Sequence, residues 1–180
     1  MGTYLVTGGA GFIGSHMVDL LLDRGFEVRV VDNLCTGRLD NLAHHASNPR
    51  CVVDQSDICN LSPGTALFKG VDYVFHFAGI GDIVPSIERP LDYMQANVQG
   101  TLAVLEAARD ARVRKLVYAA SSSCYGATNQ VPTPETAPVN LEYPYALSKY
   151  LGECAVLHWY KVYRLPVNSI RIFNAYGPRS

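Results

Sequence analysis

A glycine-rich turn between an apolar segment and an amphipathic segment places the strongest constraint on how this chain can fold. Residues 7–14 read Thr-Gly-Gly-Ala-Gly-Phe-Ile-Gly. The apolar run at residues 4–6 predicts a strand before them, and residues 15–22 predict a helix after them. Glycines in such a turn let the chain leave the strand, let a pyrophosphate reach the backbone, and let the helix lie close to the sheet. The turn therefore predicts a dinucleotide site, with the phosphates at the N-terminus of the helix.

An acidic residue ends the next predicted strand. Asp32 follows residues 26–31, which are rich in β-branched side chains. It lies about 20 residues after Gly11, the spacing at which a carboxylate binds the hydroxyls of the adenosine ribose. A carboxylate there favours NAD, because it repels the extra phosphate of NADP. Arg38 is close enough in sequence to keep NADP as an alternative, and a solvent-facing aspartate at the strand end is the simpler alternative to either.

Predicted strands and helices alternate along the chain, which is typical of a parallel sheet covered on both faces. We expect an α/β fold, a doubly wound parallel sheet with strand order 3-2-1-4-5-6. The predicted strands are residues 4–6, 26–31, 51–53, 71–76, 114–120 and 167–173. The predicted helices are residues 15–22, a weak segment at 61–69, and long segments at 91–111 and 145–163. Residues 33–48 are expected to form a loop with a short helix, and residues 130–144 a proline-rich loop.

Composition excludes several classes of protein. Hydrophobic residues make up 48% of the chain and charged residues 17%, which is typical of a globular protein. The net charge of -1 gives no basic surface for nucleic acid. The five cysteines show no C-x-x-C spacing, which suits a reducing compartment. The sequence contains neither a secretory leader pattern nor an apolar run of roughly 20 residues, so we expect a cytoplasmic protein that does not enter the membrane.

Two groups of side chains could supply acid–base chemistry. Tyr145 and Lys149 are four residues apart, so they lie on one face of a predicted helix. An unperturbed tyrosine has a pKa of about 10, and a nearby ammonium favours the phenolate that could accept a proton from an alcohol. Ser121, Ser122 and Ser123 follow the fifth predicted strand and could hydrogen-bond the reacting oxygen. Each group alone is common by chance, but both lie downstream of a dinucleotide turn.

The remaining reactive residue types carry weaker signals. Cys124 follows the serines, but no histidine accompanies it in a motif, so we interpret it as a small packed residue. The five histidines show no spacing typical of metal ligands, and no metal site is expected. His76 lies in an apolar strand and is interpreted as a hydrogen-bonded core residue.

Taken together, these motifs resemble the extended short-chain dehydrogenase/reductases. Within them the chain is most similar to the NAD-dependent epimerase/dehydratase family, in its branch of UDP-glucose 4-epimerases and their N-acetylhexosamine relatives. The resemblance runs from Thr3 to Ser180. The segments that carry it are residues 7–14, 32–34, 76–79, 121–126, 145–149 and 171–179.

The resemblance implies a Rossmann-type NAD-binding domain over residues 1–180 and a nucleotide-sugar 4-epimerase that acts through a transient 4-keto sugar and bound NAD. It implies Tyr145 as the base, Lys149 as its activator and ribose ligand, and Ser121 as the hydroxyl partner. Ser123 and Asn174 would face a nucleotide-sugar substrate, which the resemblance implies to be a UDP-sugar. The other implied cofactor-binding residues are Gly8, Gly11, Phe12, Ile13, Gly14, Asp32, Asn33, Asp57, Ile58, Phe77, Ala78, Gly79 and Asn97.

Some features depart from the family pattern or leave alternatives open. Gly81 stands where the 4-epimerases often carry a lysine that contacts the cofactor. Family members continue into a nucleotide-sugar-binding domain, which we expect to be missing from this chain. Related dehydratases carry Thr-Asp-Glu at the position of Ser121-Ser122-Ser123, which disfavours dehydration. A decarboxylase, a uronate epimerase and a catalytically idle NAD-binding module remain alternatives. The family also implies a possible homodimer through the helices at 91–111 and 145–163.

Overall fold

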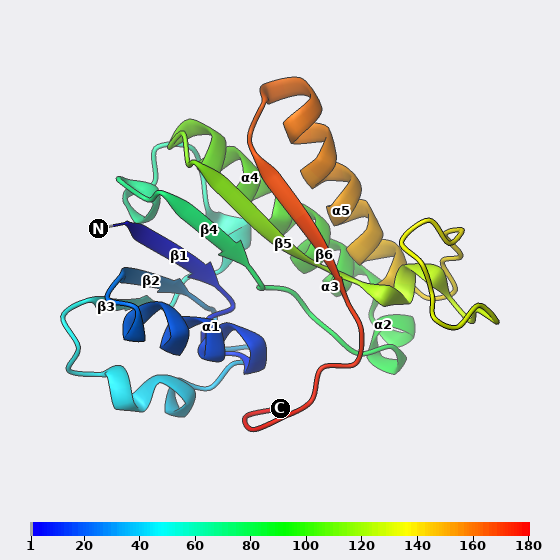
Figure 1. The fold of residues 1–180 in the computed structure, drawn as a ribbon, viewed down its shortest axis with the longest axis horizontal. Coiled ribbons are helices and arrows are strands. Elements are labelled where there is room, and N and C mark those ends of the chain that lie inside the picture. The colour runs from blue at the N-terminus through cyan, green and yellow to red at the C-terminus, as the bar shows by residue number, and fades with distance from the viewer. Residues whose placement is uncertain (1) are drawn as a thin grey trace.

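Six parallel strands form one sheet in the computed structural model, which describes residues 2–180 (Figure 1). The strand order is β3-β2-β1-β4-β5-β6, and every neighbouring pair is parallel, as the sequence predicts. Their bounds are β1 Thr3–Thr7, β2 Glu27–Val31, β3 Cys51–Asp54, β4 Tyr73–His76, β5 Lys115–Ser121 and β6 Val167–Ile172. All six lie within two residues of the predicted strands. Because β1 pairs with both β2 and β4, the winding direction changes there, and a crevice opens at the carboxyl ends of these strands.

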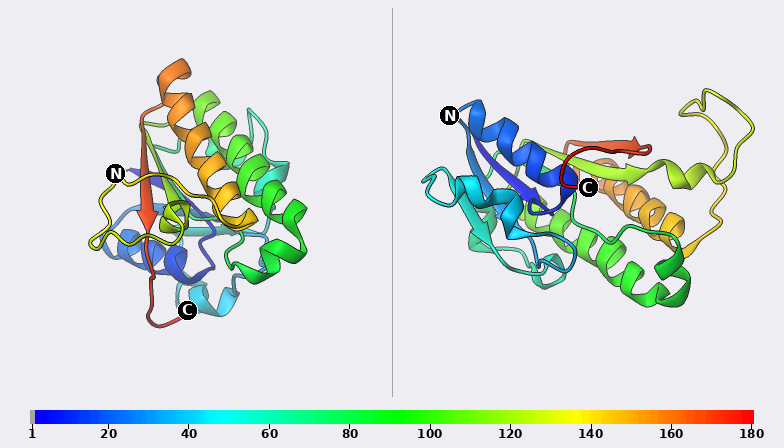
Figure 2. Two further views of the ribbon diagram at one scale, coloured as in Figure 1. Left: turned by 90° about the vertical axis from the view of Figure 1, so that its right-hand side faces the viewer. Right: turned by 90° about the horizontal axis from the view of Figure 1, so that it is seen from below.

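The two faces of the sheet are covered by different helices (Figure 2). Helix α1, Phe12–Asp23, packs on one face with the short 3-10 helix Leu39–His45. Helices α4, Gly100–Asp110, and α5, Pro144–Tyr163, pack on the other face. Side chains alternate along a strand, so Val6 joins the core under α1 while Leu5 joins the core under α4 and α5. The doubly wound arrangement thus follows from apolar strands that are buried on both sides.

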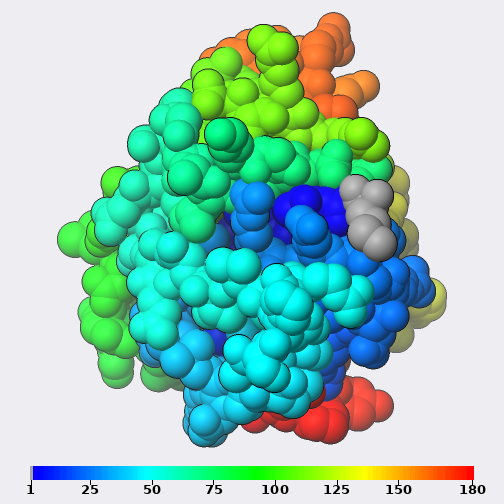
Figure 3. All heavy atoms as spheres, turned by 90° about the vertical axis from the view of Figure 1, so that its left-hand side faces the viewer, coloured from blue at the N-terminus to red at the C-terminus, as the bar shows by residue number. Residues whose placement is uncertain are grey.

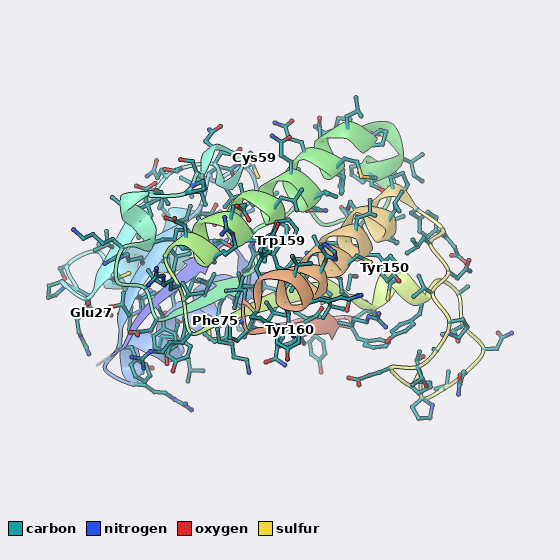
Figure 4. All side chains as sticks on the ribbon, turned by 90° about the horizontal axis from the view of Figure 1, so that it is seen from above. Glu27, Cys59, Phe75, Tyr150, Trp159 and Tyr160 are labelled. Carbon is teal, nitrogen blue, oxygen red and sulfur yellow. The ribbon has the colours of Figure 1, made fainter. Side chains whose placement is uncertain are left out.

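Helices α4 and α5 lie side by side, and Trp159 lies between them (Figure 4). Its indole Nε1 donates a 2.8 Å hydrogen bond from α5 to the Glu106 carboxylate on α4. Tyrosine and tryptophan commonly pair their polar atom in this way when their rings are buried. The contact joins the C-terminal half of α5 to α4.

Two local predictions are wrong, and one short helix was not predicted. Residues 61–69 do not form a helix: only Ala66–Phe68 make a 3-10 turn, because Pro63 and Gly64 interrupt the segment and Gly64 has a φ of +81°. Residues 91–111 are not one regular helix. They comprise α3, Pro90–Met94, a π-helical turn at Gln95–Gln99, and α4. Helix α2, Val84–Glu88, is an additional short helix in a segment with no predicted structure.

The far edge of the sheet is covered by irregular chain. In the view onto the β3 edge, the segments that follow β2 and β3 spread over that end of the molecule (Figure 3). Asn33 and Asp57 belong to these segments and lie where strands β2 and β3 end. The functional residues predicted from the sequence therefore come from separate loops and helix ends at the carboxyl ends of the strands.

Candidate functional site

One cavity of about 830 Å³ lies at the carboxyl ends of the strands. The glycine turn, Asp32, Tyr145 and Asn174 all contribute to its wall. Every cofactor-binding, substrate-binding and catalytic residue predicted above lines this cavity except Asn97. Side chains and backbone from six loops thus converge on one space, which is large enough for a ligand of cofactor size.

The glycine turn is shaped by close backbone contacts. Gly8 has a φ of +68°, and a Cβ there would lie 2.6 Å from the backbone nitrogen of Ala78. A Cβ on Gly14 would overlap the carbonyl oxygen of Gly8 and lie 2.8 Å from the Cα of Gly9. Gly11 is the N-cap of α1, and no side chain caps this helix end. The N-terminus of α1 is therefore open toward the cavity, as an anion site requires.

Asp32 and Asp57 form the wall at the ends of β2 and β3. The Asp32 carboxylate accepts hydrogen bonds from Ala10 N at 2.9 Å and from Leu34 N at 2.8 Å, which fix its orientation. Asp57 accepts from Cys59 N at 2.8 Å and from Asn33 Nδ2 at 2.9 Å. Burial opposes ionisation of Asp57, but these hydrogen bonds outweigh it and lower the pKa of the carboxyl. Both carboxylates are held in place before any ligand binds.

Tyr145 and Ser121 meet across the cavity from α5 and the end of β5. The Tyr145 hydroxyl donates to Ser121 Oγ at 3.3 Å, and Ser123 N donates to the same oxygen at 3.2 Å. Because Ser121 Oγ accepts both of these bonds, its own proton is available to a ligand. The pair can thus offer a hydrogen-bond donor and a proton acceptor to one substrate oxygen.

Lys149 is a buried ammonium one helical turn after Tyr145. Only 7% of the residue is exposed, and Nζ lies 4.5 Å from the centroid of the Tyr118 ring. Burial lowers the pKa of Lys149 from 10.5 to about 8, although the Glu153 carboxylate acts in the opposite direction. A Cβ on Gly79 would lie 2.6 Å from Asn97 Oδ1, so the glycine leaves room for that amide, while Lys149 Nζ would be at an ordinary contact distance of 3.7 Å.

Glu153 connects α5 to the edge strand. Its carboxylate accepts two bonds from Arg171 Nε, at 3.0 and 3.1 Å, and one from Ser169 Oγ at 2.9 Å. Arg171 Nη1 also donates to the Tyr125 hydroxyl at 2.7 Å. This buried ion pair holds β6 against the helix that carries Tyr145 and Lys149. It thereby fixes the position of the strand end from which the chain continues to Asn174.

Asn97 does not line the cavity, in contrast to its predicted place beside the nicotinamide. Its side chain is fully buried behind the wall. The amide oxygen accepts from Ile80 N at 2.8 Å, and the amide nitrogen donates to Ile80 O at 3.0 Å and to Ser148 Oγ at 2.9 Å. Asn97 therefore holds the loop after Gly79 and the helix between Tyr145 and Lys149, and has no free N–H for a ligand.

Sequence reasoning missed part of the cavity wall. Ile80, Ile83, Arg89, Asp92 and Gln95 also line it. Ile80, Ile83 and Arg89 come from the loop and short helix after β4, for which no regular element was predicted, and Asp92 and Gln95 come from the start of the predicted helix at 91–111. The only available signal was position, since this segment directly follows the predicted strand end at residues 76–79.

Other reactive groups lie apart from this site. Cys124 is buried, and burial raises the pKa of its thiol, which fits the packed residue expected. Within residues 2–180, the single group of three close potential metal ligands is Asp19, His44 and His45. Both imidazoles lie 2.8 Å from Asp19 Oδ1, and Arg179 lies 2.8 Å from Oδ2, so hydrogen bonds to the histidines and an ion pair with the arginine account for the cluster. No helix in the described part of the chain is long and apolar enough to cross a membrane.

Comparison with known proteins gives the class to which this fold and site belong. The model of the "NAD dependent epimerase/dehydratase family" matches residues 4–180, and the chain belongs to that family. A putative UDP-glucose 4-epimerase of Methanocaldococcus jannaschii is 38% identical over 177 residues, which are 97% of this chain and 56% of the relative. UDP-glucuronic acid decarboxylase 2 of Arabidopsis thaliana is 36% identical over 180 residues, 97% of this chain and 39% of the relative.

A solved structure agrees closely with the fold. The crystal structure of DesIV, a dTDP-glucose 4,6-dehydratase of Streptomyces venezuelae with NAD and TYD bound, superposes with a TM-score of 0.93 at 35% identity. The match covers 98% of this chain and 57% of the DesIV chain. The chain thus spans about half the length of the relatives it matches.

Proposed function

We propose that this chain is the NAD-binding part of a nucleotide-sugar 4-epimerase, and that the region binding most of the nucleotide sugar lies outside these residues. One observation carries the proposal: Ser121, Tyr145 and Lys149 share a cavity with the glycine turn and Asp32. Similarity to UDP-glucose 4-epimerases over 97% of the chain supports the same conclusion. In this proposal the substrate is a UDP-sugar, and Ser123 and Asn174 contact it from the cavity wall.

The cavity fits NAD on its own geometry. The uncapped N-terminus of α1 suits the pyrophosphate, and Asp32 is oriented by Ala10 N and Leu34 N at the end of β2. A carboxylate at this position prefers two ribose hydroxyls to a 2′-phosphate, which favours NAD over NADP. Bound NAD would supply the acceptor for a hydride from the sugar and return it to the opposite face.

The chain's own residues move and stabilise the proton. Tyr145 takes the proton of the sugar C4 hydroxyl, and Ser121 donates a hydrogen bond to the same oxygen as negative charge develops there. The Lys149 ammonium lies on the same helical face as Tyr145, one turn further along α5, and places a positive charge at this end of the cavity. After the 4-keto sugar has rotated in the site, Tyr145 returns the proton to the C4 oxygen of the opposite epimer.

A decarboxylase is the second candidate, because UDP-glucuronic acid decarboxylase 2 of Arabidopsis is similar over nearly the whole chain. The acid–base residues named here serve oxidation at C4 in either reaction. The two functions are separated by their products: a 4-epimer of the same mass from a UDP-hexose, or carbon dioxide and a UDP-pentose from a UDP-hexuronate. An idle module would bind NAD and turn over neither substrate.

Substitution of Tyr145 tests the proposal. In the protein that contains both this domain and the sugar-binding region, Tyr145→Phe should lower kcat roughly 10²–10⁴-fold, because the proton acceptor is lost while the ring is kept. Tyr143→Phe is the matched control: it removes the same hydroxyl two residues earlier, from a side chain outside the cavity wall. Near-normal turnover of UDP-galactose and UDP-glucose by Tyr145→Phe, with NAD bound, would rule out this base.

The assembly and location of the protein are also proposals. Leu91, Leu147 and Leu151 expose apolar side chains on α3 and α5, beside a shallow groove that Val98 and Leu102 help to line. We propose that a second copy of this chain packs on this surface to form a homodimer. Sedimentation of a single species at the monomer mass would contradict it.

The five free cysteines suit a reducing compartment and support a cytoplasmic location.

A further inference from the structure

His76 is a fully buried imidazole beneath the cavity, at the end of β4. It does not line the cavity, yet both of its ring nitrogens have partners. Nδ1 lies 2.6 Å from Thr7 Oγ1 on β1, and Nε2 lies 3.0 Å from Thr101 Oγ1 on α4. The ring thus bridges the strand that leads into the glycine turn and the helix that follows the π-helical turn.

One arrangement of protons keeps all the hydrogen bonds that the ring and its two threonine partners make. Thr101 Oγ1 donates to Asn97 O at 2.7 Å, so it must accept from His76 Nε2–H. Nδ1 is then bare and accepts from the Thr7 hydroxyl, whose oxygen accepts Ala78 N–H at 3.2 Å. In the other neutral tautomer, the Thr7 hydroxyl proton and the Asn97 carbonyl lose these partners. Unpaired buried groups are costly, so the network selects the Nε2–H tautomer.

The two ends of this network reach both parts of the cavity. At one end, Thr7 directly precedes Gly8, and its bond to Ala78 N holds the loop that packs on Gly8. At the other end, Thr101 holds the carbonyl of Asn97, whose side chain holds Ile80 and Ser148. The phosphate-binding turn and the helix that carries Tyr145 and Lys149 are therefore joined through one imidazole.

The charge of the ring is part of this arrangement. Burial and the nearby Lys149 ammonium lower the pKa of His76 to about 3, so the ring is neutral at physiological pH. The ionisable groups facing it are Tyr118 of β5, with ring centroids 5.5 Å apart, and Lys149 of α5. Its hydrogen-bond partners from β1 and α4 are the hydroxyls of Thr7 and Thr101. A protonated ring would place a second positive charge beside Lys149 and break the bond from Thr7.

We propose that His76, as the neutral Nε2–H tautomer, is a positioning residue that sets the Tyr145–Lys149 helix relative to the glycine turn through Thr101 and Asn97. The inference deepens the proposed function and rests on it for its effect on NAD and turnover. The tautomer and its link to Asn97 stand on the hydrogen bonds alone.

NMR of the 15N-histidine-labelled chain tests the tautomer without any assay of activity. The His76 signal is assigned by its loss in His76→Gln. We expect Nε2 to carry the proton and the ring not to titrate between pH 5.5 and 8. A proton on Nδ1, or a titration near pH 6.5, would overturn the inference whether or not the chain binds NAD.

A pair of Thr101 variants tests the link. Thr101→Val keeps the side-chain shape but removes the acceptor of Nε2–H, so the Nδ1–H tautomer of His76 should become populated and the amide signals of Ile80 and Asn97 should move. Thr101→Ser keeps the hydroxyl and should retain the wild-type tautomer and amide signals. If both variants behave alike, the hydroxyl does not transmit the position of His76 and the proposal is wrong.

The functional consequence is read from the pH dependence of NAD binding. Between pH 7 and 9.5, calorimetry on the wild type should show an inflection from Lys149, whose pKa is about 8. Thr101→Val should move this inflection, because the helix that carries Lys149 loses its link to His76 through Asn97, and Thr101→Ser should keep the wild-type profile. An unchanged profile in Thr101→Val contradicts the positioning role. Failure of the wild type to bind NAD would instead contradict the proposed function, and the NMR results would still decide the tautomer.

Discussion

The two ends of the cavity are built in opposite ways. At the glycine turn, the wall of the site is made of backbone atoms. Its geometry requires that Gly8 and Gly14 carry no side chain, because a Cβ there would collide with neighbouring backbone. At the Tyr145 end, the site depends on polar side chains buried behind the wall, among them His76, Asn97 and Ser148. One end binds by leaving room for a ligand, and the other acts by holding groups in place for it.

This difference explains which part of the site the sequence reveals. The glycine turn is local: strand, turn and helix follow one another within residues 3–23, so spacing alone predicts their arrangement. The network behind Tyr145 is not local, since His76 meets Thr7 and Asn97 meets Ser148 across large separations in the chain. No pattern along the sequence specifies such pairs, so His76 could be predicted as a bonded core residue but its partners could not.

The same distinction applies to the fold. The six strands and their order follow from apolar runs and alternation with helices, which are local and repeated signals. The π-helical turn at Gln95–Gln99 has no such signal, because the residues around it keep helical spacing. The turn places Asn97 so that its side chain reaches Ile80 and Ser148 at once. Only tertiary contacts make that irregularity favourable, so the sequence predicts one continuous helix.

Replacement of a glycine should produce the largest effect. A Cβ on Gly14 overlaps the Gly8 carbonyl, and backbone cannot move aside as a flexible side chain can. We expect Gly14→Ala to lower the free energy of unfolding by about 1–3 kcal/mol and to abolish measurable NAD binding, because the turn must open. Urea unfolding and calorimetry with NAD measure the two effects.

Gly81 supplies the matched control for that substitution. It also lines the cavity, but a Cβ there would meet nothing within 4 Å. Gly81→Ala should therefore leave stability and NAD affinity close to wild type. If Gly14→Ala binds NAD as well as Gly81→Ala does, the glycine turn tolerates a side chain at residue 14. The contrast between the two ends of the cavity is then wrong.

A smaller effect, an increase in the stability of the fold, is expected from a substitution at the Tyr145 end of the cavity. A pKa of about 8 for Lys149, against 10.5 for the exposed group, means that the folded state disfavours the ammonium. That difference corresponds to roughly 3 kcal/mol below pH 8. Lys149→Met removes this cost and also removes the contact with the Tyr118 ring, worth about 1–2 kcal/mol. We therefore expect Lys149→Met to unfold at higher urea concentration at pH 7, by a net gain of about 1–2 kcal/mol, while it loses turnover in the protein with both domains.

The pH dependence gives this prediction its sign. The folded pKa lies below the unfolded one, so the unfolded chain binds more protons between pH 8 and 10.5, and wild-type stability should rise across that interval. The advantage of Lys149→Met should be complete below pH 8 and disappear as the pH approaches 10.5. Lys161→Met, at an exposed position of the same helix, controls for the apolar substitution and should show neither effect. Loss of stability in Lys149→Met at pH 7 would mean that the ammonium is well satisfied where it lies. The charge of Lys149 would then stabilise the Tyr145 end of the cavity, and its burial would not lower the stability of the fold.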